Sequence, residues 1–144
     1  MARLRPTVLV ADDHPTVLDQ VRLLLEPDFE IVGAAASGPE LLSEAGRLHP
    51  DLIVTDVAMP GMSGLEASGI LLARDPDTRI VLLTIHGDDE IASSAFRIGV
   101  RGFVLKIKAG EELAAAVRAV LAGETFRSDL AVISGCKKDE FLRY

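Results

Sequence analysis

Short apolar runs alternate with amphipathic segments along most of this chain. Five of the runs are apolar almost throughout, which is typical of strands buried on both faces of a sheet. They cover residues 7–11, 31–36, 52–54, 79–84 and 102–105. Because helical patterns follow these runs in turn, the sequence predicts an α/β fold with a parallel sheet and helices on both of its faces.

Each predicted helix has an apolar stripe with residues three or four positions apart. The first four stripes are Val17–Val21–Leu24–Leu25, then Leu41–Leu42–Ala45–Leu48, then residues 65–74, then Ile91–Ala92–Ala95–Phe96. The fifth is Leu113–Val117–Val120–Leu121. The fourth helix is short and thinly apolar, so we expect it to be the least firmly held.

The regular pattern ends near residue 124. Residues 1–124 are therefore predicted to form one domain, and residues 125–144 a C-terminal tail or the start of a linker. A frayed end is the expected state of this tail, because chain termini are usually poorly ordered.

Composition and charge narrow the functional classes. Apolar residues make up 49% of the chain, which excludes a disordered protein. Acidic residues outnumber basic ones 22 to 15, and a net charge of −7 predicts no DNA binding by this chain alone. One cysteine excludes an internal disulfide and a cysteine-rich zinc site. We expect no membrane span and a cytoplasmic location, because no apolar run is long enough for a span or signal peptide.

Polar residues stand where the predicted strands end. Asp12 and Asp13 follow the first strand, Asp56 the third, Thr84 the fourth and Lys106 the fifth. Because parallel strands share one carboxyl edge, these side chains are expected to meet in one pocket. Each alone has an ordinary structural explanation, such as a turn former or a solvated charge. Their joint placement favours a site.

The chemistry of this group suggests phosphoryl transfer. Clustered carboxylates repel one another and require a cation, and oxygen ligands suit Mg²⁺. Asp56 beside that metal is suited to act as a nucleophile toward phosphorus, which gives an aspartyl-phosphate. Thr84 and Lys106 are then suited to bind the phosphoryl oxygens.

These motifs resemble a response-regulator receiver domain of bacterial two-component systems. The similarity rests on Asp12-Asp13-His-Pro, Asp56-Val-Ala-Met-Pro60-Gly-Met-Ser-Gly64, Leu-Leu-Thr84 and Gly102-Phe-Val-Leu-Lys106. It covers residues 7 to about 123, and the opening motif is most similar to the NarL/FixJ branch. The resemblance implies a flavodoxin-like, CheY-like sheet of order 2-1-3-4-5 with five flanking helices.

The resemblance also implies roles for individual residues. Asp56 is the phosphoacceptor for a sensor histidine kinase. Mg²⁺ is held by Asp13, Asp56 and the backbone carbonyl of Ala58, with Asp12 assisting. Thr84 and Phe103 switch position on phosphorylation, and Lys106 binds the phosphoryl group. The implied output is a protein-binding face made of the fourth helix, fifth strand and fifth helix, which is also a candidate homodimer surface.

An isoleucine directly follows each of two site residues, Lys106 and Thr84. Ile107 follows Lys106 where many receivers have proline. Ile85, after Thr84, is expected to gate access to Asp56 with help from His86, and the alternative is that Ile85 extends the strand into the core.

The chain is too short after Gly123 for the DNA-binding domain that such regulators carry. It is expected to be either part of a longer transcriptional regulator or a stand-alone receiver. We expect it not to be an enzyme, because an aspartate-nucleophile phosphohydrolase needs an acid where Ala58 stands. Two other classes of protein are disfavoured. A pseudo-receiver, which is a pure interaction module, would have a damaged acidic pocket, and no damage is visible in the sequence. A flavin-binding protein would have a phosphate cradle where this chain has acidic strand ends.

Overall fold

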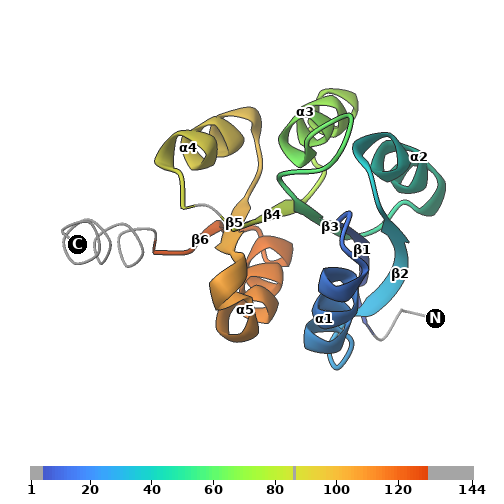
Figure 1. Ribbon diagram of the computed structural model, residues 1–144, viewed down its shortest axis with the longest axis vertical. Coiled ribbons are helices and arrows are strands. Elements are labelled where there is room, and N and C mark those ends of the chain that lie inside the picture. Colours follow the sequence, from blue (N-terminus) through green and yellow to red (C-terminus); the bar gives the residue numbers. More distant parts are fainter. Residues whose placement is uncertain (1–4, 86, 130–144) are drawn as a thin grey trace.

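A computed structural model describes residues 5–85 and 87–129 of the chain. Its strands form one parallel sheet in the order β2-β1-β3-β4-β5-β6 (Figure 1). The strands are β1 (Thr7–Ala11), β2 (Glu30–Ala35), β3 (Leu52–Asp56), β4 (Ile80–Thr84), β5 (Gly102–Leu105) and β6 (Phe126–Arg127). The helices are α1 (Pro15–Leu25), α2 (Gly38–Leu48), α3 (Gly64–Arg74), α4 (Asp89–Ile98) and α5 (Ala109–Leu121), with a 3-10 turn at Lys106–Lys108. The predicted order 2-1-3-4-5 and the five helices are confirmed.

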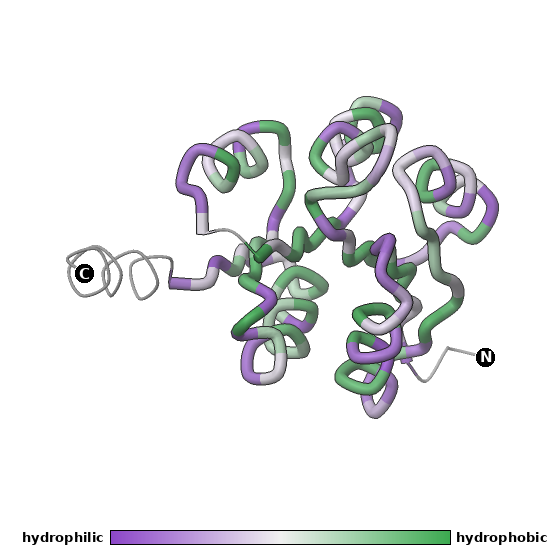
Figure 2. Tube along the Cα trace, viewed as in Figure 1, coloured by the Kyte–Doolittle hydropathy of each residue, from purple (hydrophilic) through white to green (hydrophobic). Residues whose placement is uncertain are grey.

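Helices cover both faces of the sheet. Figure 1 shows α2, α3 and α4 on one side and α1 and α5 on the other. Side chains alternate between two cores: Leu9 packs on the α2–α4 side, whereas Val8 and Val10 pack on the α1–α5 side. The strands are accordingly apolar along most of their length, as Figure 2 shows. No helix in the described part of the chain is long and apolar enough to cross a membrane.

Side-chain caps start three of the helices. Ser37 accepts a hydrogen bond from the backbone N–H of Glu40 at the start of α2. Asp88 caps α4 in the same way. Ser63 and Glu66 form a reciprocal capping box at the start of α3.

The sixth strand is an addition to the predicted sheet. Phe126 and Arg127 pair with Gly102 and Phe103 along the outer edge of β5. The expectation of a frayed end is therefore wrong for these two residues, because the open edge of β5 offers backbone partners that the sequence pattern does not reveal. The domain boundary at residue 124 stays a prediction, and residues 130–144 lie outside the described part of the chain.

Candidate functional site

The carboxyl edge of the sheet gathers the predicted polar residues. Asp12 follows β1, Asp56 ends β3, Thr84 ends β4 and Lys106 follows β5. Lys106 Nζ lies 2.9 Å from Asp12 Oδ2 and 3.3 Å from Asp56 Oδ2. Asp12, Asp56 and Thr84 are buried, with exposed fractions of 2%, 5% and 4%. The structure therefore brings together residues that are far apart in the sequence, as the strand order predicts.

A close approach between α3 and β3 fixes the backbone around Asp56. The N–H of Gly64 donates a 2.7 Å hydrogen bond to the carbonyl oxygen of Val57. A Cβ atom at Gly64 would lie 1.9 Å from the carbonyl oxygen of Asp56, so no other residue fits there without moving the backbone. Glycine at this position lets the first turn of α3 pack directly against the residue that carries the candidate nucleophile.

Burial and the neighbouring charges of Asp12 and Lys106 set the pKa of the Asp56 carboxyl. Loss of water on burial and the neighbouring charge of Asp12 raise the pKa of Asp56, while Lys106 opposes that rise. Burial also lowers the pKa of Lys106, but the hydrogen bond to Asp12 and the charge of Asp56 outweigh it, so the pKa of Lys106 is raised. Lys106 therefore remains a cation beside two buried carboxyl groups, where it can attract an incoming anion.

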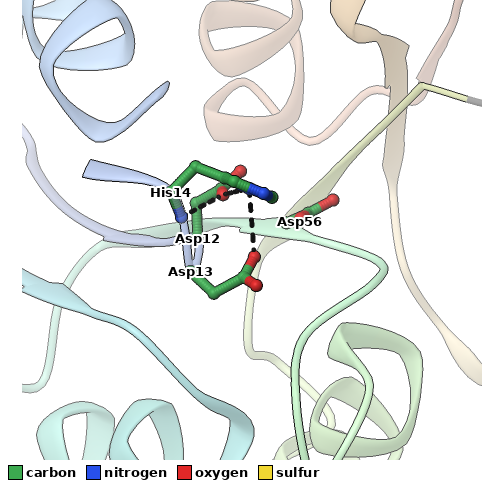
Figure 3. A group of neighbouring side chains, drawn as sticks. All are labelled: Asp12, Asp13, His14 and Asp56. Atoms are coloured by element: carbon green, nitrogen blue, oxygen red, sulfur yellow. Dashed lines mark hydrogen bonds and ion pairs between the residues drawn. The ribbon is translucent and has the colours of Figure 1, made fainter. Parts of the chain in front are cut away.

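His14 joins the acidic group, although it is not among the site residues predicted from the sequence. Its Nδ1 lies 3.0 Å from Asp12 Oδ1 and 3.2 Å from Asp13 Oδ1, while its backbone N–H also donates to Asp12 (Figure 3). Figure 3 shows Asp56 beside these three residues. The available signal was position: His14 directly follows the two aspartates and precedes Pro15, where α1 begins.

The donor set fits a divalent cation such as Mg²⁺. Asp12, Asp13, His14 and Asp56 each offer one ligand atom, and these atoms lie within 4.8 Å of one another. Asp13 Oδ1 is a buried oxygen that forms no hydrogen bond among the described residues, although the ring Nδ1 of His14 lies 3.2 Å away. A buried carboxylate oxygen without a hydrogen bond is stabilised by a cation, so the pocket suits an ion with oxygen ligands.

The remaining predicted residues lie around this pocket. The Ala58 backbone nitrogen is 3.4 Å from Asp56 Oδ1, so the loop after β3 stays close to the Asp56 carboxylate. Phe103 is fully buried in the core on the α2–α4 side. Ile85 is 69% exposed, so it does not pack inward as an extension of β4. His86 lies outside the described residues. The roles of these residues as ligand, switch and gate stay predictions.

Known proteins share both the sequence pattern and the fold. The family model for the response regulator receiver domain matches residues 8–118. The oxygen regulatory protein NreC of Staphylococcus carnosus (strain TM300) is 36% identical over 122 residues, which are 83% of this chain and 56% of NreC. The chain thus spans little more than half the length of this curated relative.

Two solved structures show the same architecture. A LuxR-family two-component response regulator from Aurantimonas sp. SI85-9A1 is 31% identical, with a TM-score of 0.83 over 96% of this chain and 99% of that one. The signal receiver domain of the putative response regulator NarL from Mycobacterium tuberculosis is 29% identical, with a TM-score of 0.80 over 85% of this chain and 100% of that one. These similarities agree with the predicted NarL/FixJ branch, and the chain belongs to the response regulator receiver domain family of two-component systems.

Proposed function

We propose that this receiver domain accepts a phosphoryl group on Asp56 from a sensor histidine kinase. The observation that supports it most strongly is the contact of Lys106 with both Asp12 and Asp56 at the carboxyl edge of the sheet. A buried carboxylate, a buried hydroxyl at Thr84 and a fixed cation provide a nucleophile and two groups for the phosphoryl oxygens.

The transfer forms one bond and breaks another. An Asp56 oxygen bonds to phosphorus as the bond from phosphorus to the donor's leaving group breaks, and the leaving group departs on the opposite side. The charge on the phosphoryl oxygens is met by Lys106 Nζ and by the Thr84 hydroxyl. Both groups lie at the ends of strands in one rigid sheet, so they need little rearrangement before the reaction.

Mg²⁺ is the proposed cofactor of this pocket. Asp13, Asp56 and the Ala58 carbonyl would hold it with Asp12 assisting, and when bound it neutralises charge on the carboxylates and on the phosphoryl oxygens. His14 touches Asp12 and Asp13 on the same side, so it orients the two carboxylates that the metal requires.

The proposed output is a change in a protein-binding face. Thr84 and Phe103 lie at paired strands, since Thr84 is opposite Leu105 and Leu82 is opposite Phe103. A shift at Thr84 toward a phosphoryl oxygen would reach Phe103 and the surface of α4, β5 and α5 beside it. That face is the proposed contact surface for a homodimer or for an output domain in a longer transcriptional regulator.

Ile85 is the proposed gate of the pocket. It is exposed directly after Thr84, where the chain leaves β4 toward α4, and its β-branched side chain is stiff. An exposed stiff side chain at that place restricts the in-line approach that a donor or an attacking water needs.

Intact mass after incubation with acetyl phosphate and Mg²⁺ tests the proposed reaction. The parent chain is expected to gain one phosphoryl group, which is lost in base as an acyl phosphate is. Asp56→Asn is expected to gain none, whereas the matched exposed change Asp19→Asn leaves the reaction unchanged. A full adduct in Asp56→Asn would exclude Asp56 as the acceptor.

A further inference from the structure

The segment after α5 is fixed to β5 by both backbone and side-chain bonds. The N–H of Phe126 donates to the carbonyl of Arg101, and the N–H of Ser128 donates to the carbonyl of Phe103. Both hydrogen bonds have a donor–acceptor distance of 2.9 Å. The next donor on β5 is the N–H of Leu105. It binds the side-chain hydroxyl of Ser128 at 3.0 Å in a buried position.

The side chain of Ser128 therefore continues the hydrogen bonding to β5 beyond the last paired residues of β5 and β6. It is 2% exposed although it lies near the end of the described chain. Its hydroxyl accepts from Leu105 and donates to the carboxylate of Glu112, in the first turn of α5. One small side chain thus connects β5 to α5 and satisfies a backbone N–H that would otherwise be buried without a partner.

The bond to Leu105 lies one residue from the candidate site. Leu105 is followed directly by Lys106, whose Nζ contacts Asp12 and Asp56. The backbone of Leu105 is held on its other side by β4, opposite Thr84. The backbone from which the Lys106 side chain extends is therefore held next to Thr84 on one side and by Ser128 on the other.

The same segment also reaches α4. Arg127 forms an ion pair with Asp89, the first residue of α4. Residues 126–128 thus contact all three elements of the proposed output face: β5 through the ladder, α5 through Ser128 and Glu112, and α4 through Arg127 and Asp89.

We infer that Ser128 is a positioning residue for Lys106, and that docking of residues 126–128 on β5 and occupation of the phosphoryl site by an anion strengthen each other. This inference rests on the proposed function of Asp56. The physical link is the Leu105 N–H: when Ser128 holds it, the lysine is kept in reach of Asp56, and an anion that binds Lys106 in turn holds the strand end. Thermodynamic linkage requires that docking of residues 126–128 strengthens anion binding by the same factor as anion binding strengthens the docking.

The linkage gives the C-terminal segment a function beyond covering an open strand edge. A segment that only seals the edge would affect the stability of the whole domain, and it would weaken metal and anion binding to a similar extent. A segment that positions Lys106 affects anion binding more than metal binding, because Lys106 is proposed to bind the phosphoryl oxygens directly and is not itself one of the proposed metal ligands.

The test compares Mg²⁺ and beryllofluoride, a phosphoryl mimic, by titration calorimetry on the 144-residue chain. Ser128→Ala is expected to weaken beryllofluoride binding about three- to tenfold, as loss of one buried hydrogen bond predicts, with Mg²⁺ affinity changed less than about twofold. Ser128→Thr, which keeps the hydroxyl, is expected to restore binding. Thr125→Ala, an exposed change in the same segment, is the matched control.

The reciprocal effect is read by amide exchange. Beryllofluoride with Mg²⁺ is expected to slow exchange of the Leu105 and Ser128 amides in the parent, and to lose that effect on Leu105 in Ser128→Ala. If Ser128→Ala does not fold, Glu112→Gln provides the second variant, since it weakens the partner of the hydroxyl and is expected to lower beryllofluoride affinity by a smaller factor.

Two results would overturn the inference. One is parent-like beryllofluoride affinity in folded Ser128→Ala or, where that variant does not fold, in Glu112→Gln. The other is an equal loss of Mg²⁺ and beryllofluoride affinity. Failure of the parent itself to bind beryllofluoride or to take a phosphoryl group would overturn the proposed function of Asp56, so the two failures are distinguishable.

Discussion

Helices α3 and α4 lie on the same face of the sheet, but they are held very differently. The buried residues of α3 are Gly64, Ala67, Ser68, Leu71 and Leu72, and those of α4 are Ala92 and Ala95. The start of α3 packs on the backbone of Asp56, whereas the start of α4 is tied by an ion pair to β6. Helix α3, beside Asp56, is therefore anchored by backbone contact and by buried large apolar side chains, whereas α4 buries only small ones and packs Ile91 and Phe96 at its partly exposed margin.

This difference assigns separate tasks to the two regions. The α3 side keeps Asp56 in place, and little of it can move without breaking the core. The α4 side has few buried apolar contacts, so it can open or shift at a lower free-energy cost. The expectation that the fourth helix is the least firmly held stays a prediction, and the two small buried residues of α4 support it.

Gly64→Ala tests the anchoring of α3 and has the largest expected effect. The added methyl group meets the carbonyl oxygen of Asp56 at 1.9 Å, so the backbone must move. The free energy of unfolding is expected to fall by about 3 kcal/mol, the upper part of the range for overpacked sites. Urea denaturation measures it.

Gly46→Ala is the matched control for that change. Gly46 lies in α2 with open space around its Cβ position, so alanine is expected to raise the free energy of unfolding by up to about 1 kcal/mol through helix propensity. Equal effects of the two substitutions would contradict the close packing of α3 on Asp56.

Ile85→Ala tests the gate at the start of the connection to α4. Removing the exposed, stiff side chain is expected to raise both the rate of reaction with acetyl phosphate and the rate of decay of the phosphorylated chain. Each should rise by roughly three- to tenfold, equivalent to about 1 kcal/mol in the barrier. Unchanged rates in a folded variant that binds Mg²⁺ would mean that Ile85 does not control access.

Asp13→Asn tests whether the carboxylates of the acidic pocket repel one another when no metal is bound. Without Mg²⁺, neutralising one carboxylate of the pocket is expected to raise the free energy of unfolding by about 1 kcal/mol and to remove Mg²⁺ binding. Denaturation midpoints without metal, compared with those of the exposed Asp19→Asn, measure the difference. A variant less stable than the parent would argue against repulsion in the pocket.

Arg127→Ala has the smallest expected effect on stability. The ion pair with Asp89 lies at the surface, where Arg127 is 40% and Asp89 81% exposed, so the free energy of unfolding is expected to change by less than about 0.5 kcal/mol. Amides in the first turn of α4 are nevertheless expected to exchange faster, while those of α3 stay unchanged. Arg74→Ala at the end of α3 is the control, and equal changes in both helices would remove the distinction between them.

The sequence predicted the parts of the molecule that depend on local pattern. Apolar runs located β1 to β5, and the polar residues after them located Asp12, Asp56, Thr84 and Lys106 at one edge of the sheet. These predictions succeed because the ends of parallel strands are fixed by topology as soon as the strands are assigned.

The sequence could not predict features that depend on tertiary neighbours. β6 is two residues long and has no apolar period, so its pairing depends on the open edge of β5. The bond from Leu105 to Ser128 joins residues 23 positions apart, and no sequence motif marks it. The position of His14 between two carboxylates likewise depends on the turn between β1 and α1, where its ring folds back over Asp12 and Asp13.

Direct mapping of the phosphorylated residue tests the central claim most sharply. The chain is treated with acetyl phosphate and Mg²⁺, the acyl phosphate is reduced with borohydride to an alcohol, and the peptides are sequenced by mass spectrometry. We expect homoserine at position 56 and unmodified aspartate at Asp12 and Asp13. Homoserine at either of those residues, or none at position 56 in a chain that has gained a phosphoryl group, would contradict the assignment of Asp56 as the phosphoacceptor.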